Sequence, residues 1–278
     1  MSEAITKEPS DAEIERKAEG TRIFNFRHSK ARYDEYAKKL ESDSPQGSID
    51  IEFQALDDLT LEGHELARKQ AHAFFDLMNP HSDIFYIVSS NLTRALQTAD
   101  IYARVAMERG FNVIRHKKTG SQIADKIGKG YVRSIDALSV NNGDELKDSV
   151  FNPPSQLPPI NWQAVDSEVK AKWDEARRIV LADDKGSWGA NLFAHSAEVK
   201  QIFPSMKSSQ DLYDGQYKRL LRLAEFAKKK AGNERVNILS FGHENYMGVP
   251  LEQDTGNHAL PNCEGVELRD GKLVRLVL

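Results

Sequence analysis

Residues 23–29 read IFNFRHS, a short apolar run that ends in a guanidinium and an imidazole. Such a run, stopped by charged residues, predicts a buried strand over residues 21–26. Arg27 and His28 then fall at the carboxyl end of the strand, which is the edge where open α/β sheets bind their ligands. The stretch therefore predicts an α/β fold and one part of a binding site.

A second imidazole follows a similar run near the other end of the chain. Residues 236–241 read VNILSF and predict another buried strand, and His243 and Glu244 come shortly after it. Strands that end in this way place their last side chains at the same edge of a sheet. We therefore expect the two histidines to share one site.

A third strand, expected at residues 84–88, leads into the sequence SSNLTRALQTA (residues 89–99). The spacing of its apolar residues predicts a helix with Arg94 in the first turn. The helix dipole repels a cation at this position unless an anion is bound there, which favours a functional role for Arg94. Two arginines and two imidazoles that converge on a helix N-terminus would form an anion pocket suited to phosphate oxygens.

Strands alternate with helices over much of the chain. Apolar residues at helical spacing predict helices over residues 60–78, 92–106 and 213–227, and residues 265–278 are typical of a terminal hairpin. This alternation is typical of parallel βαβ units. We therefore expect an α/β fold, a three-layer sandwich with a mostly parallel central sheet flanked by helices.

The chain is expected to form one domain. Residues 1–20 are polar and rich in charge, which indicates a disordered arm or a short loose helix. Residues 21–278 are expected to form a single α/β domain. Within it, residues 116–210 lose the alternating pattern and predict a cap-like insertion, with one helix over residues 166–181.

Composition narrows the class of protein. The formal net charge of -4 favours neither nucleic acid nor a membrane surface as a partner. The single Cys263 excludes an internal disulfide and forms no zinc-ligand pattern with the 8 histidines, so we expect no metal and no cofactor. The sequence contains no signal peptide and no run that could span a membrane, so a cytoplasmic location is expected.

Four short motifs, taken in order, resemble the histidine phosphatase superfamily, also called phosphoglycerate mutase-like, of which this chain would be a divergent member. They are Arg27-His28, residues 59–63 (LTLEG) with Gln70-Ala71, residues 89–99, and Gly242-His243. The resemblance covers about residues 22–110 and from about 213 to the C-terminus. The stretch between these two parts matches no motif of the family.

The resemblance implies roles for the site residues. His28 would be the nucleophile that forms a phosphohistidine, and His243 would donate a hydrogen bond as charge develops. Arg27 and Arg94 would hold the phosphoryl oxygens. Ser29 replaces the usual glycine, and its hydroxyl either donates to phosphate or points away from the pocket.

Two further assignments stay open from the sequence. Ser90 is a helix-capping residue or a phosphate ligand. The leaving group needs an acid, and Glu244 stands where one branch of the family keeps an Asp donor. The alternatives for this acid are the carboxylates of Asp136, Asp144 and Glu145.

The function expected from these residues is hydrolysis of a small phosphorylated molecule, a phosphomonoester, without a metal. A phosphoglycerate mutase-type phosphotransferase is the alternative among enzymes. A non-catalytic phosphate-binding module on the same fold is the alternative among binding proteins. The basic stretch at residues 117–133 is either a solvated face or a cap that attracts an anionic substrate.

Overall fold

A computed structural model describes residues 20–32, 57–135, 167–184, 191–192, 194–204, 208–232, 234–243 and 247–278. Its centre is a 7-stranded sheet in the order β3-β2-β5-β1-β6-β7, with β4 also paired to β2. The strands are β1 (Arg22–Arg27), β2 (Asp83–Ser89), β3 (Asn112–Val113), β4 (Val132–Ser134), β5 (Arg235–Gly242), β6 (Gly265–Arg269) and β7 (Lys272–Arg275). All pairs are parallel except those that β6 makes with β1 and β7.

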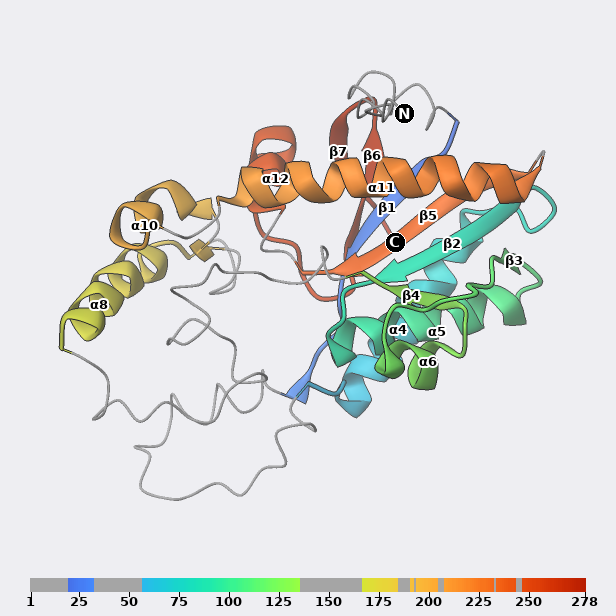
Figure 1. Ribbon diagram of the computed structural model, residues 1–278, viewed down its shortest axis with the longest axis horizontal. Helices are drawn as coiled ribbons and strands as arrows, with labels where there is room; N and C mark the ends of the chain where they lie inside the picture. The colour runs from blue at the N-terminus through green and yellow to red at the C-terminus, as the bar shows by residue number, and fades with distance from the viewer. Residues whose placement is uncertain are drawn as a thin grey trace, which may run out of the picture.

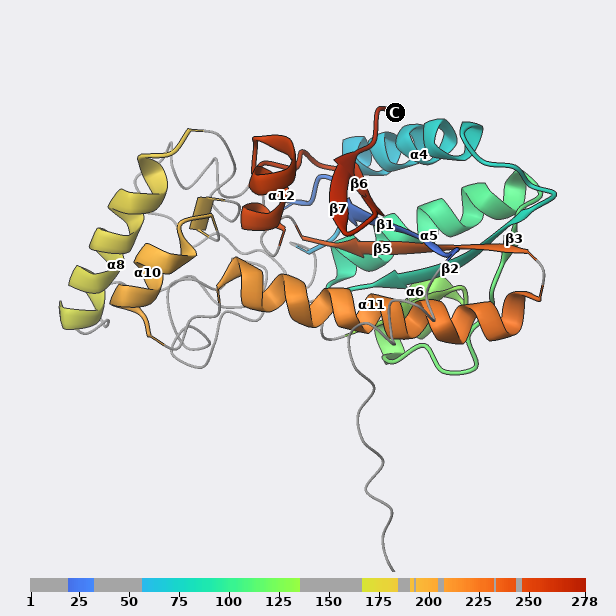
Figure 2. The same ribbon diagram turned by 90° about the horizontal axis from the view of Figure 1, so that it is seen from above.

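Helices cover both faces of this sheet, so the expected three-layer α/β sandwich is confirmed (Figures 1 and 2). One face packs against α4 (Leu61–Asp76), α5 (Thr93–Glu108) and α6 (Gln122–Gly128), and the other against α11 (Ser209–Ala231). α12 (Gly248–Thr255) packs on β6 and β7 through Leu251, and the described helices beyond the sheet are α8 (Ser167–Leu181) and α10 (Ser196–Ile202). None of the helices in the described residues is long and apolar enough to cross a bilayer.

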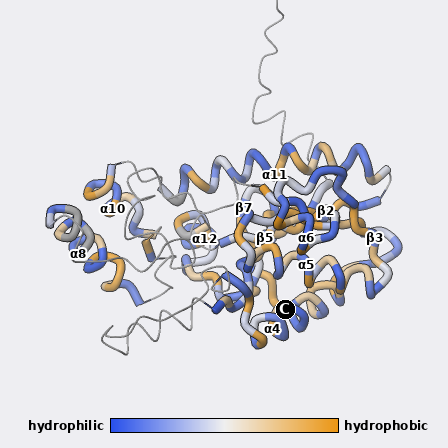
Figure 3. The backbone as a smooth tube through the Cα atoms, turned by 60° about the horizontal axis from the view of Figure 1, so that its bottom comes forward, coloured by the Kyte–Doolittle hydropathy of each residue, from blue (hydrophilic) through white to orange (hydrophobic). Residues whose placement is uncertain are grey.

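The strands are apolar because both of their faces are buried. In β2, Phe85 and Ile87 join the core under α4 and α5, whereas Ile84, Tyr86 and Val88 join the core under α11. Side chains alternate across a strand, so a strand covered on both sides reads as a continuous apolar run. Figure 3 shows the resulting concentration of hydrophobic residues in the central strands.

The core under α4 and α5 is aromatic. Phe26 stacks on Phe241 of the neighbouring strand at 5.2 Å between ring centroids, and Phe74 of α4 contacts Phe26 edge-on at 5.3 Å. Tyr102 of α5 lies 4.8 Å from Phe241. Aromatic pairs in these arrangements add to the stabilisation from burial alone. These contacts fix the positions of β1, β5 and α5 relative to one another near the carboxyl ends of the strands.

The expected terminal hairpin is confirmed. β6 and β7 pair antiparallel through a two-residue turn, in which Asp270 and Gly271 have φ angles of 51° and 77°. Two positive φ angles are what the commonest hairpin turn requires, and an Asp-Gly pair meets that need.

The region expected to be a cap begins with part of the sheet. Residues 116–135 include α6 and β4, and β4 pairs with the carboxyl half of β2, where Ser134 is opposite Ser89. β4 is only three residues long, too short for its alternation to be recognised in sequence. The expected helix at residues 166–181 corresponds to α8 (Ser167–Leu181), whereas residues 136–166 and most of residues 1–20 lie outside the described part of the chain.

A polar cluster joins α8 and α10 to the chain that follows α12. His258, fully buried, contacts the side-chain oxygen of Asn191 through Nε2 at 2.8 Å. His195 lies between the carboxylates of Asp183 and Glu198, at 2.9 and 2.8 Å. Burial alone would lower the pKa of His195, but these two carboxylates raise it above the ordinary value.

The chain just after His28 packs closely against Gly63 in the first turn of α4. A Cβ at this position would lie 2.2 Å from the carbonyl oxygen of Lys30. We expect Gly63→Ala to lower the free energy of unfolding by about 1–3 kcal/mol, because the backbone must shift to admit the methyl group. Urea denaturation measures the change.

Gly215 in α11 is the matched control, since a Cβ there would meet nothing within 4 Å. We expect Gly215→Ala to raise the free energy of unfolding by about 0.5–1 kcal/mol, because alanine is the better helix former. A Gly63→Ala protein as stable as the wild type would contradict the close packing of Lys30 on α4.

Candidate active site

Three neighbouring parallel strands end close together at the carboxyl edge of the sheet. β1, β5 and β2 lie side by side (Figure 1). Arg27 of β1 is opposite Gly242 of β5, and Ser89 of β2 is opposite Phe241 of β5. Beyond the strands, the amide of His28 donates to the carbonyl of Gly242 at 3.0 Å, and the amide of Ser90 donates to the carbonyl of Phe241 at 2.9 Å. His28, Ser90 and His243 therefore come together at the carboxyl edge of the sheet.

The two histidines are in contact. Their ring centroids are 5.1 Å apart with the planes inclined at 63°, and each residue is 2% exposed. The sequence predicted that the two histidines share a site, because each follows the carboxyl end of a strand. They do lie together, because β1 and β5 are paired in parallel.

Arg94 lies between the two imidazoles. It is 2% exposed, its Nε donates to Nε2 of His28 at 3.1 Å, and its Nη2 is 3.5 Å from Nδ1 of His243. Arg94 is in the first turn of α5, as expected from the sequence. The arrangement therefore joins a buried cation and two rings at a helix N-terminus, which is suited to an anion.

The hydrogen bonds define the tautomer of His28. Its Nδ1 is 2.7 Å from the carbonyl oxygen of Ser29, which can only accept, so Nδ1 carries the proton. The Nε of Arg94 can only donate, so Nε2 of His28 presents a lone pair. The ring is thus held with an unprotonated nitrogen directed into the site.

Both imidazoles are held neutral. Burial lowers the pKa of His28 well below its ordinary value, and the charge on Arg94 and the neighbouring His243 and Arg27 lower it further. Burial also lowers the pKa of His243, followed by the charges of Arg94 and Arg27. A second positive charge next to a buried guanidinium is unfavourable, so each ring keeps a lone pair at neutral pH.

Arg27 and Ser90 are near the histidines but have other partners in this structure. The Nη1 of Arg27 donates to the carbonyl of Leu260 at 2.8 Å, which ties the guanidinium to the loop before β6. The hydroxyl of Ser90 is 3.1 Å from Nε2 of His243. Ser90 therefore orients the second imidazole.

Ser29 points away from the histidine rings. Its hydroxyl donates to the carbonyl of Gly63 at 2.7 Å, and its amide donates to the hydroxyl of Thr98 at 3.0 Å. Ser29 is not among the described residues with a positive φ angle, so serine causes no backbone strain there. Of the two orientations open from the sequence, the structure has the one directed away from the pocket.

Two residues of this site were not identified from the sequence. Asp57 forms an ion pair with Nη1 of Arg94 and accepts from the amide of Thr93 at 2.6 Å. Thr98 accepts from Ser29 and donates to the carbonyl of Arg94 at 2.7 Å. Asp57 precedes the LTLEG motif by two positions, but no spacing rule connects it with a helix that begins 36 residues later.

The carboxylates considered for the acid lie outside the described residues. This holds for Glu244 and equally for Asp136, Asp144 and Glu145. Among the described residues, no group of three or more histidine, cysteine or carboxylate side chains could hold a metal ion.

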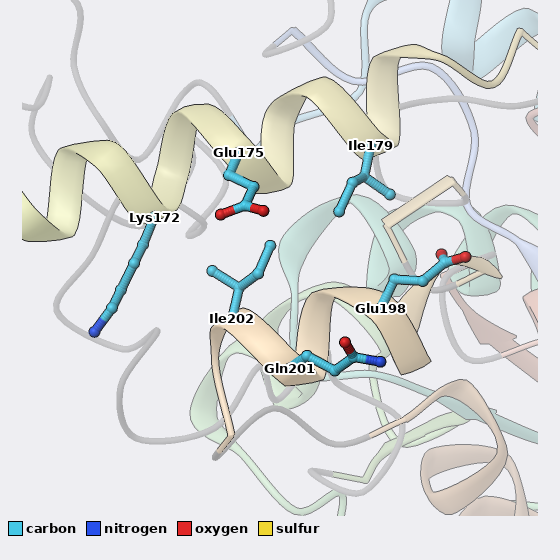
Figure 4. A pocket seen from close by; sticks show the side chains of 6 residues that line it. All are labelled: Lys172, Glu175, Ile179, Glu198, Gln201 and Ile202. Atoms are coloured by element: carbon cyan, nitrogen blue, oxygen red, sulfur yellow. The ribbon is translucent and has the colours of Figure 1, made fainter.

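A separate hollow lies between α8 and α10. Figure 4 shows its lining, which comes from these two helices alone: Lys172, Glu175, Ile179, Glu198, Gln201 and Ile202. None of these side chains belongs to the strand ends that carry the histidines. The hollow is therefore a different feature from the site around His28.

A buried pair of imidazoles around a guanidinium, at the carboxyl edge of a mostly parallel sheet, defines an α/β protein with a candidate anion site. No protein-family model matches the chain, and no curated protein matches its sequence. Solved structures that match in fold include a phosphoglycerate mutase from Bacillus anthracis str. Sterne, which is 13% identical, with 93% of this chain and 92% of that chain covered and a TM-score of 0.46.

Two further structures match over a similar length. The protein TTHB049 from Thermus thermophilus is 16% identical, with 93% of this chain and 100% of that chain covered and a TM-score of 0.40. A protein provisionally assigned as an alpha-ribazole-5'-P phosphatase, from Escherichia coli str. K-12 substr. MG1655, is 14% identical, with 93% and 95% covered and a TM-score of 0.40. The chain is similar to these proteins, and the roles of its residues are argued below from its own geometry.

The buried histidines predict how stability depends on pH. Their pKa values are lowered in the fold, so below about pH 6.5 the unfolded state takes up protons that the folded state does not. Stability is therefore greatest above that pH and is lost as the pH falls below it. We expect His28→Gln and His243→Gln each to reduce the slope of the free energy of unfolding against pH by ~1.4 kcal/mol per pH unit.

Urea denaturation at a series of pH values between about 7.5 and about 5 measures the slope for wild type and both variants. A wild-type slope that neither variant reduces would show that these imidazoles do not remain neutral on folding.

Proposed function

We propose that this chain is a divergent member of the histidine phosphatase superfamily that hydrolyses small phosphomonoesters through a phosphohistidine at His28. The observation that carries the proposal is the lone pair on Nε2 of His28, held in a buried neutral ring and directed toward Arg94. An imidazole in this tautomer is a nucleophile at neutral pH. The four sequence motifs support the family assignment, since three of them supply the residues that meet here.

In the first step, a phosphoryl oxygen replaces Nε2 of His28 as the acceptor of the Nε–H of Arg94, and Nε2 then attacks phosphorus. The bond between phosphorus and the ester oxygen breaks as that oxygen takes a proton from the acid, and a phosphorus–nitrogen bond forms. In the second step, water attacks the phosphohistidine and gives a proton to the carboxylate that acted as the acid. The phosphorus–nitrogen bond breaks, Nε2 of His28 recovers its lone pair, and inorganic phosphate leaves. Phosphoryl transfer depends on cations and donors around the equatorial oxygens. Arg94 and Arg27 provide the cations, and His243 the further donor, so the proposal needs neither a metal nor a cofactor.

The two serines have supporting roles in this proposal. Ser90 orients His243 through the contact at 3.1 Å between its hydroxyl and Nε2. Ser29 keeps the turn after His28 packed on α4 and α5 through Gly63 and Thr98. A nucleophile and its electrostatic partner work best when their own positions are fixed by such contacts.

His28→Ala tests the nucleophile. We expect wild-type protein to hydrolyse aryl and alkyl phosphomonoesters and to carry acid-labile, base-stable phosphate after a rapid acid quench. In His28→Ala both the label and turnover should disappear, with turnover lower by at least about 10³-fold. Hydrolysis that persists in the variant would overturn the proposal.

Glu244→Gln tests the acid. The ester oxygen needs a proton as it leaves, and the demand is greatest for alkoxides, which are poor leaving groups. We propose Glu244 as the donor and expect the variant to lose about 10²-fold in kcat on an alkyl phosphate but much less on p-nitrophenyl phosphate. An equal loss on both substrates would argue against Glu244, and the same comparison on Asp136, Asp144 and Glu145 variants identifies an alternative.

A further inference from the structure

The buried guanidinium of Arg94 has an anionic partner inside the site. Its three nitrogens each face a different group: Nε faces His28, Nη2 faces His243, and Nη1 forms the ion pair with Asp57. The side chains of Arg94 and Asp57 are 3% and 11% exposed, so the pair is almost fully removed from solvent. At such a position a carboxylate strongly affects both the orientation and the net charge of the site.

Asp57 is itself fixed by the helix that carries Arg94. Its second carboxylate oxygen accepts from the amide of Thr93 at 2.6 Å, at the N-terminus of α5. Leu92, the residue at the N-cap position, provides no side-chain hydrogen bond to this helix. Asp57 thus caps α5 from a distant segment, and a carboxylate at a helix N-terminus is also favoured by the helix dipole.

The segment around Asp57 is held on two sides. On one side, Arg32 donates its amide to the carbonyl of Asp58, and Thr60 donates its amide to the carbonyl of Lys30. On the other side, Gln97 of α5 donates to the carboxylate of Asp58 at 2.9 Å and accepts from the amide of Leu59 at 2.8 Å. The segment therefore connects the chain just after His28 with the first turns of α5.

We propose that Asp57 is a positioning residue that aims the guanidinium of Arg94 at His28 and, through its negative charge, weakens the binding of phosphate so that product can leave. The mechanistic half of this inference rests on the function proposed above. With Arg94 fixed at Nη1, its Nε and Nη2 stay directed toward the two imidazoles. The carboxylate also offsets the charge of Arg94, which lies between both rings, and this lowers the attraction for a dianion.

Asp57→Asn tests the effect on charge and the effect on orientation together. Asparagine keeps the size of the side chain but removes its charge, so we expect the dissociation constant of inorganic phosphate to fall about tenfold. We expect kcat to fall about tenfold at the same time, because asparagine has one acceptor oxygen and cannot accept from both Arg94 and the amide of Thr93, so Arg94 is held less firmly. A purely structural loss would weaken phosphate binding and slow turnover together, so the opposite signs are specific to this proposal.

Asp58→Asn is the matched control, since it makes the same chemical change one residue away but keeps a side-chain oxygen that accepts from Gln97, so the segment around Asp57 stays in place. We expect its phosphate affinity and kcat to stay within about twofold of wild type. If Asp58→Asn reproduces the effects of Asp57→Asn, or if Asp57→Asn leaves phosphate affinity unchanged or weaker, the proposal is wrong. An unchanged kcat in a folded Asp57→Asn protein would overturn the positioning role.

Asp57→Glu covers the case in which Asp57→Asn does not fold. It keeps the charge but displaces it, so we expect phosphate affinity within about twofold of wild type and a kcat lower by about tenfold. A kcat equal to that of wild type, or phosphate binding about tenfold tighter, would overturn the proposal.

Titration calorimetry with inorganic phosphate needs no turnover, which keeps this inference distinguishable from the proposed function. Tighter phosphate binding by Asp57→Asn in a protein that shows no His28-dependent hydrolysis would support the effect of Asp57 on affinity and reject the enzyme. Hydrolysis by wild type together with weaker phosphate binding by Asp57→Asn would reject the role of Asp57 alone.

Discussion

The buried charge of Arg94 is the constraint on which the rest of the site depends. A guanidinium at the first turn of a helix is opposed by the helix dipole, and at 2% exposure it is also deprived of water. It persists because Asp57, His28 and His243 surround it with acceptors. The same charge, after burial itself, helps to keep the pKa of His28 low, so the cation that suits an anion also keeps the neighbouring imidazole unprotonated.

The sheet provides the rigidity that this arrangement requires. β1, β5 and β2 run parallel in continuous register, and stacked aromatic rings below their ends hold β1 and β5 against α5. At the opposite end of β2, burial would raise the pKa of Asp83, but hydrogen bonds from Arg235 on β5 hold it below its ordinary value. The pair of strands is thus fixed at both ends, and a site built on strand ends gains precision from it.

Much of this organisation could be predicted from the sequence because it depends on local patterns. The strands before His28 and His243 are continuous apolar runs, and the helix after Ser90 has one apolar face. The spacing of apolar residues and the order of these segments were therefore sufficient to predict the strands, the helix and their common site. Asp57 could not be found in that way, because its ion pair and its capping of α5 join segments with no shared periodicity. The direction of the Ser29 hydroxyl was equally inaccessible, since it depends on how closely Gly63 approaches the turn.

Arg94 and Asp57 place a cation and a carboxylate together in one candidate anion site. A site with two guanidiniums and two neutral imidazoles would bind phosphate most tightly if no carboxylate were present, yet tight binding of product opposes turnover. Asp57 contacts Nη1 of Arg94 and the backbone of α5, whereas Nε2 of His28 accepts from Nε of the same guanidinium. In the proposed role, the carboxylate therefore offsets the charge of Arg94 from a nitrogen other than the one that faces His28.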